Sequence, residues 1–252
     1  MTAARFAATV SYDGTDFGGS QVQPNARTVQ QELERAAATL FGEPVRVSLA
    51  GRTDSGVHAW GQVAAFSAET CLEAHTVGRA LNAHLPGDVA VRDVRSVPAE
   101  FDPRRWARKR WYRYTLATSE ARVPLLARTA WHAGDNLEFE AMRLAATSLL
   151  GSHDFRAAAG ALEPHRRPVR TVTRAEWRHE GCTAFFDIEA DAFLPHMVRM
   201  LVGAIVRVGR NAMTLEEFVR LLEQAQPGTL GPSAPPQGLC LQRVWYEEGY
   251  RP

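Results

Sequence analysis

The segment 51–59, Gly-Arg-Thr-Asp-Ser-Gly-Val-His-Ala, combines flexible backbone positions with charged side chains. Gly51 and Gly56 permit unusual backbone angles, so the segment can turn tightly and approach a ligand closely. Asp54 lies between them, and Arg52 precedes it by two residues. A neighbouring guanidinium favours the ionised carboxylate, which suits a nucleophile or an electrostatic stabiliser better than a proton donor. The alternative is an aspartate that only caps its own turn.

Basic residues gather in two stretches of the chain. Lys109 is the only lysine among the 29 basic residues. The arginine fork fits phosphate oxygens, and aromatic rings among the arginines can stack on unpaired bases. A solvated strand edge and a general bias toward arginine are the alternatives. The first stretch is Arg104, Arg105, Arg108, Lys109, Arg110 and Arg113, interleaved with Trp106, Trp111, Tyr112 and Tyr114; the second is His165, Arg166, Arg167, Arg170, Arg174 and Arg178.

The composition is that of an ordinary soluble globular protein. Of the 252 residues, 45% are hydrophobic and 23% charged, which excludes a disordered, collagen-like or coiled-coil chain. No apolar run approaches the roughly 20 residues of a membrane helix, and the N-terminus lacks the order of a signal peptide. Cys71, Cys182 and Cys240 form no CxxC pair, so neither a zinc ribbon nor a disulfide framework is expected. These features predict a cytoplasmic protein without membrane association.

Hydrophobic periodicity predicts the same order of elements, βαββαβ, in both halves of the chain. Capping boxes predict where two helices of the first half begin, at Thr28 with Gln31 and at Thr70 with Glu73. In the second half Pro195 suits the first turn of a helix, and a short extra helix begins at Thr214. The predicted strands are 6–12, 45–49, 62–66, 89–94, 111–117, 169–177, 184–190 and 239–245; the main helices are 28–41, 70–85, 139–150 and one from about 195.

This duplicated order predicts an α+β protein of two ferredoxin-like halves with mainly antiparallel sheets. The first half, residues 1–105, carries the 51–59 loop, and the second half is residues 106–252. The sheets are expected to form a central RNA-binding cleft.

The 51–59 loop resembles the signature G-R-T-D-A-G-V-H of the bacterial tRNA pseudouridine synthase A family. Further family motifs follow in the right order along the whole chain. They are Tyr12-Asp-Gly-Thr15, Gly19-Ser-Gln21, Thr28-Val-Gln-Gln-Glu-Leu33, Asn82-Ala-His-Leu-Pro-Gly-Asp-Val89, Phe101-Asp-Pro-Arg104, Tyr112-Arg-Tyr114, Phe193-Leu-Pro-His-Met-Val-Arg199 and Gly238-Leu-Cys-Leu241.

The resemblance implies a homodimeric enzyme that turns uridine into pseudouridine at positions 38, 39 and 40 of the tRNA anticodon stem-loop, without metal or cofactor. It implies that Asp54 is the catalytic aspartate and that Tyr112 packs against the target base. Arg52 would hold the place of the flipped nucleotide or orient the carboxylate, and Arg199 would be the second basic partner of Asp54. The implied RNA contacts are Phe101, Asp102, Arg104, Arg105, His165 and Arg166.

Two residues depart from the family pattern. Ser20 stands where the family usually has tryptophan, so a packing or stacking contact is expected to be missing, and Ser55 replaces the usual alanine. The chemistry itself fits the residues. The reaction breaks the N1–C1′ bond and rejoins the base through C5 without gain or loss of electrons, so no cofactor motif is required. Whether the carboxylate attacks C1′, attacks C6 or removes the C2′ proton stays open.

Two other functions match parts of the sequence. A phosphohydrolase of the haloacid-dehalogenase type would match Tyr12-Asp-Gly-Thr15, but the nucleophilic aspartate of its DxDGT motif is Ser11 here. A non-catalytic RNA-binding protein of the same fold is the second rival, and the joint presence of Asp54, Arg52 and Tyr112 argues against it.

His58 is expected to be structural. His196 lies one helical turn from Arg199, so both can face one site.

Overall fold

The computed structural model describes residues 2–160 and 167–247 and divides into two compact units. The first unit comprises residues 2–108 and 241–247, and the second comprises 109–160 and 167–240. The expected α+β class with mainly antiparallel pairing is confirmed. His165 and Arg166, which were expected to contact RNA, lie outside the described residues.

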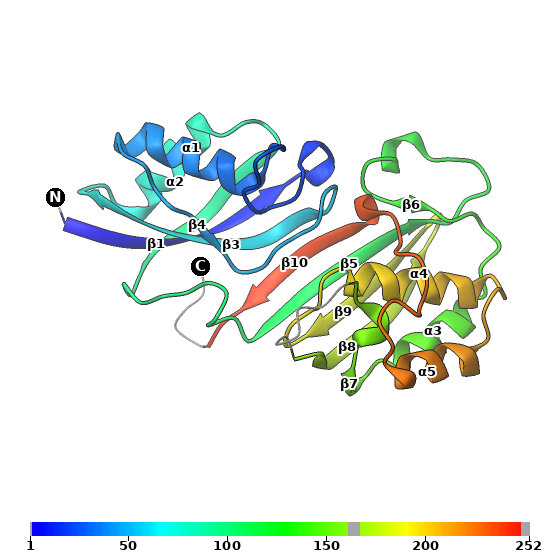
Figure 1. The fold of residues 1–252 in the computed structure, drawn as a ribbon. Coiled ribbons are helices and arrows are strands. Elements are labelled where there is room, and N and C mark those ends of the chain that lie inside the picture. The colour runs from blue at the N-terminus through cyan, green and yellow to red at the C-terminus, as the bar shows by residue number, and fades with distance from the viewer. Residues whose placement is uncertain (1, 161–166, 248–252) are drawn as a thin grey trace. The chain divides into compact units, whose positions relative to one another are not determined.

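The first unit is an antiparallel sheet with two helices on one face (Figure 1). The strands run in the order β4-β1-β3-β10, and β2 pairs with β3. Ala8, Phe66, Leu33, Leu81 and Val91 meet in the core between sheet and helices. The elements are β1 (Thr2–Tyr12), α1 (Val29–Phe41), β2 (Ser48–Leu49), β3 (His58–Thr70), α2 (Ala74–His84), β4 (Val89–Val97) and, from β10 (Leu239–Trp245), residues 241–245.

The start of α1 is confirmed in atomic detail, whereas the capping box predicted for α2 is absent. The Thr28 side chain accepts a hydrogen bond from the Gln31 N–H, and the Gln31 side chain accepts one from the Thr28 N–H. Thr70 instead pairs with Thr2 as the last residue of β3. Glu73 occupies the N-cap of α2 without a side-chain hydrogen bond. Sheet pairing across the chain therefore overrides the local capping pattern.

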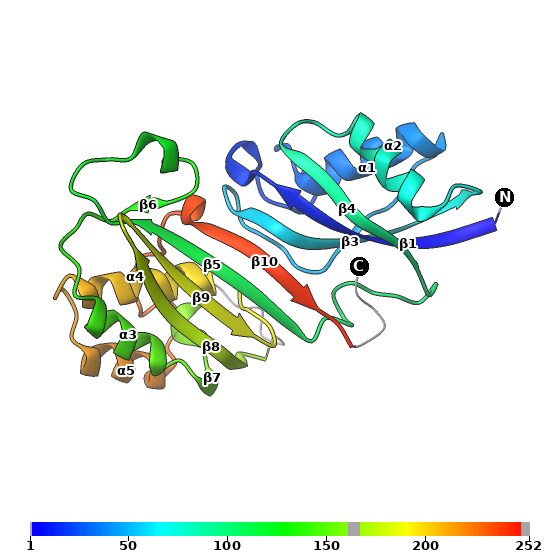
Figure 2. The same ribbon diagram turned by 180° about the vertical axis from the view of Figure 1, so that it is seen from behind.

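The second unit is a sheet in the order β5-β9-β8-β7, with helices α3, α4 and α5 on one face (Figures 1 and 2). All three of these strand pairings are antiparallel; β6 pairs with β5 in parallel. Pro195 precedes α4 rather than occupying its first turn. The elements are β5 (Lys109–Ala117), β6 (Trp131–His132), α3 (Phe139–Thr147), β7 (Gly151–Asp154), β8 (Val169–Glu180), β9 (Thr183–Ala190), α4 (Met197–Gly209) and α5 (Leu215–Gln224).

The last strand, β10, is found at the predicted residues Leu239–Trp245. Its residues 241–245 belong to the first unit, although the sequence places them in the half that follows residue 105. A β-carbon added to Gly61 would lie 2.3 Å from the Gln242 carbonyl oxygen, so β3 and this part of β10 run in close contact. Such pairing between distant segments has no local signal in the sequence.

Candidate active site

Asp54 lies on the loop that joins β2 to β3 and is partly exposed. The Val57 N–H donates to the Asp54 carbonyl at 3.1 Å, which closes a tight turn directly after the aspartate. Gly56 has φ +76° in this turn, a conformation that favours glycine. Gly51, by contrast, is not in the left-handed region.

The segment 17–20 holds this loop on both sides of Asp54. Before the aspartate, the Thr53 N–H donates to Ser20 Oγ at 2.9 Å, and the Ser20 N–H donates to the Thr53 carbonyl at 3.1 Å. After it, the Ser55 hydroxyl donates to the Phe17 carbonyl at 3.1 Å. The backbone at Asp54 is therefore fixed from both directions.

The same segment is bonded to the first turn of α1. The Gln30 N–H donates to the Ser20 carbonyl at 3.0 Å, and the Val29 N–H donates to the Gly19 carbonyl at 3.4 Å. These contacts satisfy N–H groups that a helix leaves without internal partners. Asp54 is thus connected to α1 through one short segment. Ser20 is fully buried in this segment. In place of the contact that a tryptophan would make, the serine forms two hydrogen bonds with Thr53 of the loop.

The end of β1 supports the loop from a second side. The hydroxyl groups of Tyr12 and Thr53 lie 2.8 Å apart and form a buried hydrogen bond. A β-carbon on Gly14 would lie 2.0 Å from the Val57 carbonyl oxygen, so only glycine fits there. His58 Nδ1 accepts a hydrogen bond from the Gly14 N–H at 3.0 Å. This contact is in keeping with the structural role expected for His58.

Ion pairs of Arg27 hold the segment before α1 in place. They were not predicted from the sequence. Arg27 donates two hydrogen bonds to the Asp88 carboxylate, at 2.7 and 2.9 Å, and its Nε donates to Glu32 at 2.7 Å. Its guanidinium also stacks 4.2 Å from the centre of the Phe17 ring. The hydrogen bonds from Arg27 hold the pKa of the Asp88 carboxyl below its ordinary value. The spacing of 61 residues between the partners hides this contact in the sequence.

In the second unit, Tyr112 and Tyr114 share the buried face of β5, because alternate side chains of a strand point to the same side. The Tyr112 ring meets Phe193 edge-on, with 5.1 Å between ring centres, and is 8% exposed. The Tyr114 hydroxyl donates to the Pro235 carbonyl at 2.7 Å. Burial raises the pKa of Tyr114 above its ordinary value, so this phenol stays protonated and acts as a donor.

Arg199 lies in the first turn of α4 next to His196, as their spacing predicts. Its Nε donates to the Ala234 carbonyl at 2.8 Å, and its Nη1 lies 3.5 Å from His196 Nδ1. His196 has φ +62° at the N-cap of α4, a strained conformation for a residue with a side chain. Arg52, on the Asp54 loop of the first unit, is exposed.

Among the expected RNA contacts that the structure describes, Arg104 and Arg105 are exposed, whereas Phe101 is buried. The Phe101 ring is buried between Trp106 and Tyr246. Asp102 Oδ1 accepts hydrogen bonds from the N–H groups of Arg104 and Arg105, at 2.8 and 2.9 Å. The Arg105 side chain is 87% exposed. Phe101 and Asp102 therefore fix the turn that presents Arg104 and Arg105.

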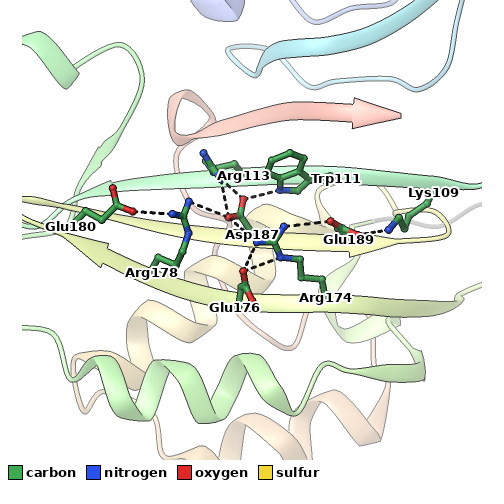
Figure 3. A network of polar contacts seen from close by, with 9 residues as sticks. All are labelled: Lys109, Trp111, Arg113, Arg174, Glu176, Arg178, Glu180, Asp187 and Glu189. Atoms are coloured by element: carbon green, nitrogen blue, oxygen red, sulfur yellow. Dashed lines mark hydrogen bonds and ion pairs between the residues drawn. The ribbon is translucent and has the colours of Figure 1, made fainter. Parts of the chain in front are cut away.

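In the second unit, four basic residues of the two arginine-rich stretches are paired with carboxylates (Figure 3). They are Lys109, Arg113, Arg174 and Arg178. Asp187 in β9 is fully buried and accepts two hydrogen bonds from Arg113 and one from Trp111 Nε1, at 2.7–2.9 Å. Arg174 and Arg178 lie 3.7 and 3.6 Å from the same carboxylate. Glu176, Glu180 and Glu189 complete the network together with Lys109. These cations are engaged by carboxylates, so the sequence overestimates the charge offered to RNA.

Two further classes of site have no candidate among residues 2–160 and 167–247. No group of three or more His, Cys, Asp or Glu residues there is arranged to hold a metal ion. No helix in that part of the chain is long and apolar enough to cross a membrane.

Comparison with known proteins agrees with the resemblance carried by the loop. The model of the family described as tRNA pseudouridine synthase matches residues 8–104 and 145–247. The chain is 40% identical over 240 residues to the tRNA pseudouridine synthase A of Citrifermentans bemidjiense, covering 95% of this chain and 96% of the relative. It is 42% identical to that of Myxococcus xanthus, covering 97% and 93%, and 43% identical to that of Chloroflexus aurantiacus, covering 95% and 88%. The chain belongs to the tRNA pseudouridine synthase family of isomerases.

Proposed function

We propose that this enzyme converts uridine to pseudouridine at positions 38, 39 and 40 of the tRNA anticodon stem-loop, with Asp54 as its catalytic carboxylate and the target base flipped out of the helix. The observation that carries the proposal is the double anchoring of Asp54. Residues 53 and 55 are both bonded to the segment 17–20, so the carboxylate is carried on a fixed backbone. A preorganised charge is what stabilises a charged transition state without reorganisation.

The reaction exchanges one bond of the sugar carbon for another. The N1–C1′ bond breaks, the uracil turns, and a C5–C1′ bond forms; C5 then loses its hydrogen and N1 gains a proton. Attack on C1′, attack on C6 and removal of the C2′ proton all require an ionised carboxylate at a defined position. Extrusion of the base costs a few kcal/mol, which contacts to the flipped nucleotide must offset.

Three residues are proposed to receive that nucleotide. The Tyr112 ring packs against the target base, and base–aromatic stacking contributes about 1–3 kcal/mol. Phe193 holds the Tyr112 ring edge-on, which supports a preset orientation. Arg52 holds the vacated position or orients Asp54, and Arg199, braced by the Ala234 carbonyl, is the second basic partner of the aspartate.

Phosphate contacts are assigned to the turn that contains Arg104 and Arg105, with Phe101 and Asp102 as its support. By the family resemblance, the enzyme acts as a homodimer in the cytoplasm, needs no metal or cofactor, and uses His165 and Arg166 as further RNA contacts.

The test is to map pseudouridine in unmodified tRNA transcripts after incubation with the enzyme, by mass spectrometry after a derivatisation that adds mass to pseudouridine but not to its isomer uridine. We expect modification at each of positions 38, 39 and 40 that carries uridine, and loss of signal when that uridine is replaced by cytidine. Pseudouridine formed only outside the anticodon stem-loop would contradict the proposed target. Binding of tRNA without any product would favour the non-catalytic alternative.

A further inference from the structure

The buried hydroxyl of Ser20 contacts the residue directly before Asp54. We propose that Ser20 is a positioning residue for the isomerisation, which sets the orientation of the Asp54 backbone through Thr53. The inference rests on the proposed catalytic role of Asp54 and goes beyond it, because it assigns a task to a residue outside the reacting groups.

The backbone and side-chain polar groups of Thr53 are all fixed by two neighbours, Ser20 and Tyr12. The Thr53 N–H donates to Ser20 Oγ, its carbonyl accepts from the Ser20 N–H, and its hydroxyl bonds the Tyr12 hydroxyl. Ser20 is 0% and Thr53 7% exposed, so water does not compete for these groups. Thr53 therefore has one arrangement in which every polar group is satisfied.

Removal of the Ser20 hydroxyl affects one of these bonds and leaves the others in place. The backbone bonds of Ser20 to Thr53 and to Gln30 do not depend on its side chain. Ser20→Ala would leave the Thr53 N–H buried without its acceptor, which is a costly state that the loop relieves by moving. The next residue is Asp54, so the movement reaches the carboxylate. A misplacement of about 1 Å in a catalytic group can cost about 10²-fold in rate.

Hydrogen bonds of the two residues after Asp54 limit this movement. The Ser55 hydroxyl and the Gly56 N–H both donate to the Phe17 carbonyl, at 3.1 and 3.4 Å. The loop therefore stays attached to the segment 17–20 when the Ser20 hydroxyl is lost. We expect a tilt of the Asp54 peptide rather than an unfolded loop, and hence a loss in turnover rather than in tRNA binding.

The experiment compares Ser20→Ala with Thr214→Ala in the full chain. Thr214 caps α5 in the second unit by accepting a hydrogen bond from the Glu217 N–H, so its hydroxyl serves a helix rather than the Asp54 loop. Loss of this helix cap lowers the stability of the protein without a direct effect on the Asp54 loop. Turnover is followed by the release of tritium from tRNA labelled at C5 of uridine, and melting temperatures are recorded for both variants.

Ser20→Ala is expected to lower kcat about 10- to 100-fold while KM for tRNA stays within about twofold. Thr214→Ala is expected to keep the wild-type kcat, and Ser20→Thr, which retains the hydroxyl, to recover kcat. A kcat of Ser20→Ala no lower than that of Thr214→Ala, or a rise in KM alone, would overturn the positioning role.

The same assay separates this inference from the proposed function. Asp54→Asn must abolish tritium release from a tRNA that the wild-type enzyme modifies. If Asp54→Asn retained the wild-type rate, the proposed catalytic role would fail, and the positioning role with it. If Asp54→Asn were inactive and Ser20→Ala fully active, only the role of Ser20 would be wrong.

Discussion

Gly19 packs against the backbone of Thr53: a β-carbon on Gly19 would lie 3.0 Å from the Thr53 carbonyl oxygen. Gly19 also has φ +105°, which side chains rarely adopt. Gly19→Ala therefore combines backbone strain with a push against the residue before Asp54. We expect it to lower kcat at least about tenfold, since small displacements of catalytic groups are costly, and to lower the free energy of unfolding, measured by urea denaturation.

Gly42 is the matched control for this prediction. It has φ +74° after α1, but a β-carbon there would meet nothing within 4 Å. Gly42→Ala should lower the free energy of unfolding by about 1–2 kcal/mol through strain alone and leave kcat unchanged. Equal kcat values in the two variants would show that Gly19 matters only for stability.

If the exposed Arg104 and Arg105 contact phosphates, the affinity for tRNA falls as the salt concentration rises. Each phosphate contact adds about 0.7–0.9 to the slope of log K against log salt concentration. Arg105→Ala should lower this slope by about one contact, measured by filter binding over a salt series.

Arg178→Ala is the control for that series, because Arg178 is engaged by Glu180 and Asp187. It should leave the slope unchanged. A larger change in slope for Arg178→Ala than for Arg105→Ala would place the RNA surface on the sheet of the second unit instead of on the turn.

The carboxylate of Asp187 is predicted to be essential for the stability of the second unit. Asp187→Ala would leave three guanidinium groups without their shared partner, and disruption of such a buried charge pair costs about 3–5 kcal/mol. Glu180 pairs with Arg178 on the surface of the same network, so Glu180→Gln should cost at most about 1 kcal/mol. Chemical denaturation followed by tryptophan fluorescence measures both; similar losses would contradict the central place of Asp187.

The Arg27–Asp88 pair predicts how stability responds to acid. Arg27 lowers the pKa of folded Asp88 below the ordinary value of 3.8, so unfolding at low pH takes up a proton. The stabilisation is present above that value and is lost as the pH falls below it toward the folded pKa. Asp88→Asn should reduce the free energy of unfolding at pH 7 by about 1–2 kcal/mol, after allowance for partial exposure.

Urea denaturation at a series of pH values between about 7 and 3 tests this. The difference between wild type and Asp88→Asn should be constant from neutral pH to about pH 4 and should shrink below it. A difference that grew on acidification would mean that Asp88 is not the stabilised carboxylate.

Local patterns in the sequence predicted much of the fold. The capping box at Thr28 and the strand predicted at 111–117 depend on neighbouring residues, and both are found. The capping box at Thr70 fails because Thr70 pairs with Thr2, which lies 68 residues earlier in the chain. β10 lies at its predicted residues, but its place beside β3 joins segments far apart in the chain and has no local signal.

In the site, too, local features could be predicted from the sequence and contacts between distant segments could not. Gly-Arg-Thr-Asp identifies the loop, and the spacing of His196 and Arg199 predicts their contact. The bonds of Ser20 to Thr53 could not be predicted, because they join segments that are 33 residues apart. The charge of the arginines was visible, but the partner shared by Arg113, Arg174 and Arg178 was not, since Asp187 lies on the neighbouring strand β9.

The central claim is that the Asp54 carboxylate performs the isomerisation. Asp54→Asn keeps the size of the side chain and removes its charge. We predict no measurable tritium release from C5-labelled tRNA under single-turnover conditions, with a Kd for tRNA within about threefold of the wild-type value. Tritium release by Asp54→Asn at the wild-type rate would contradict the claim.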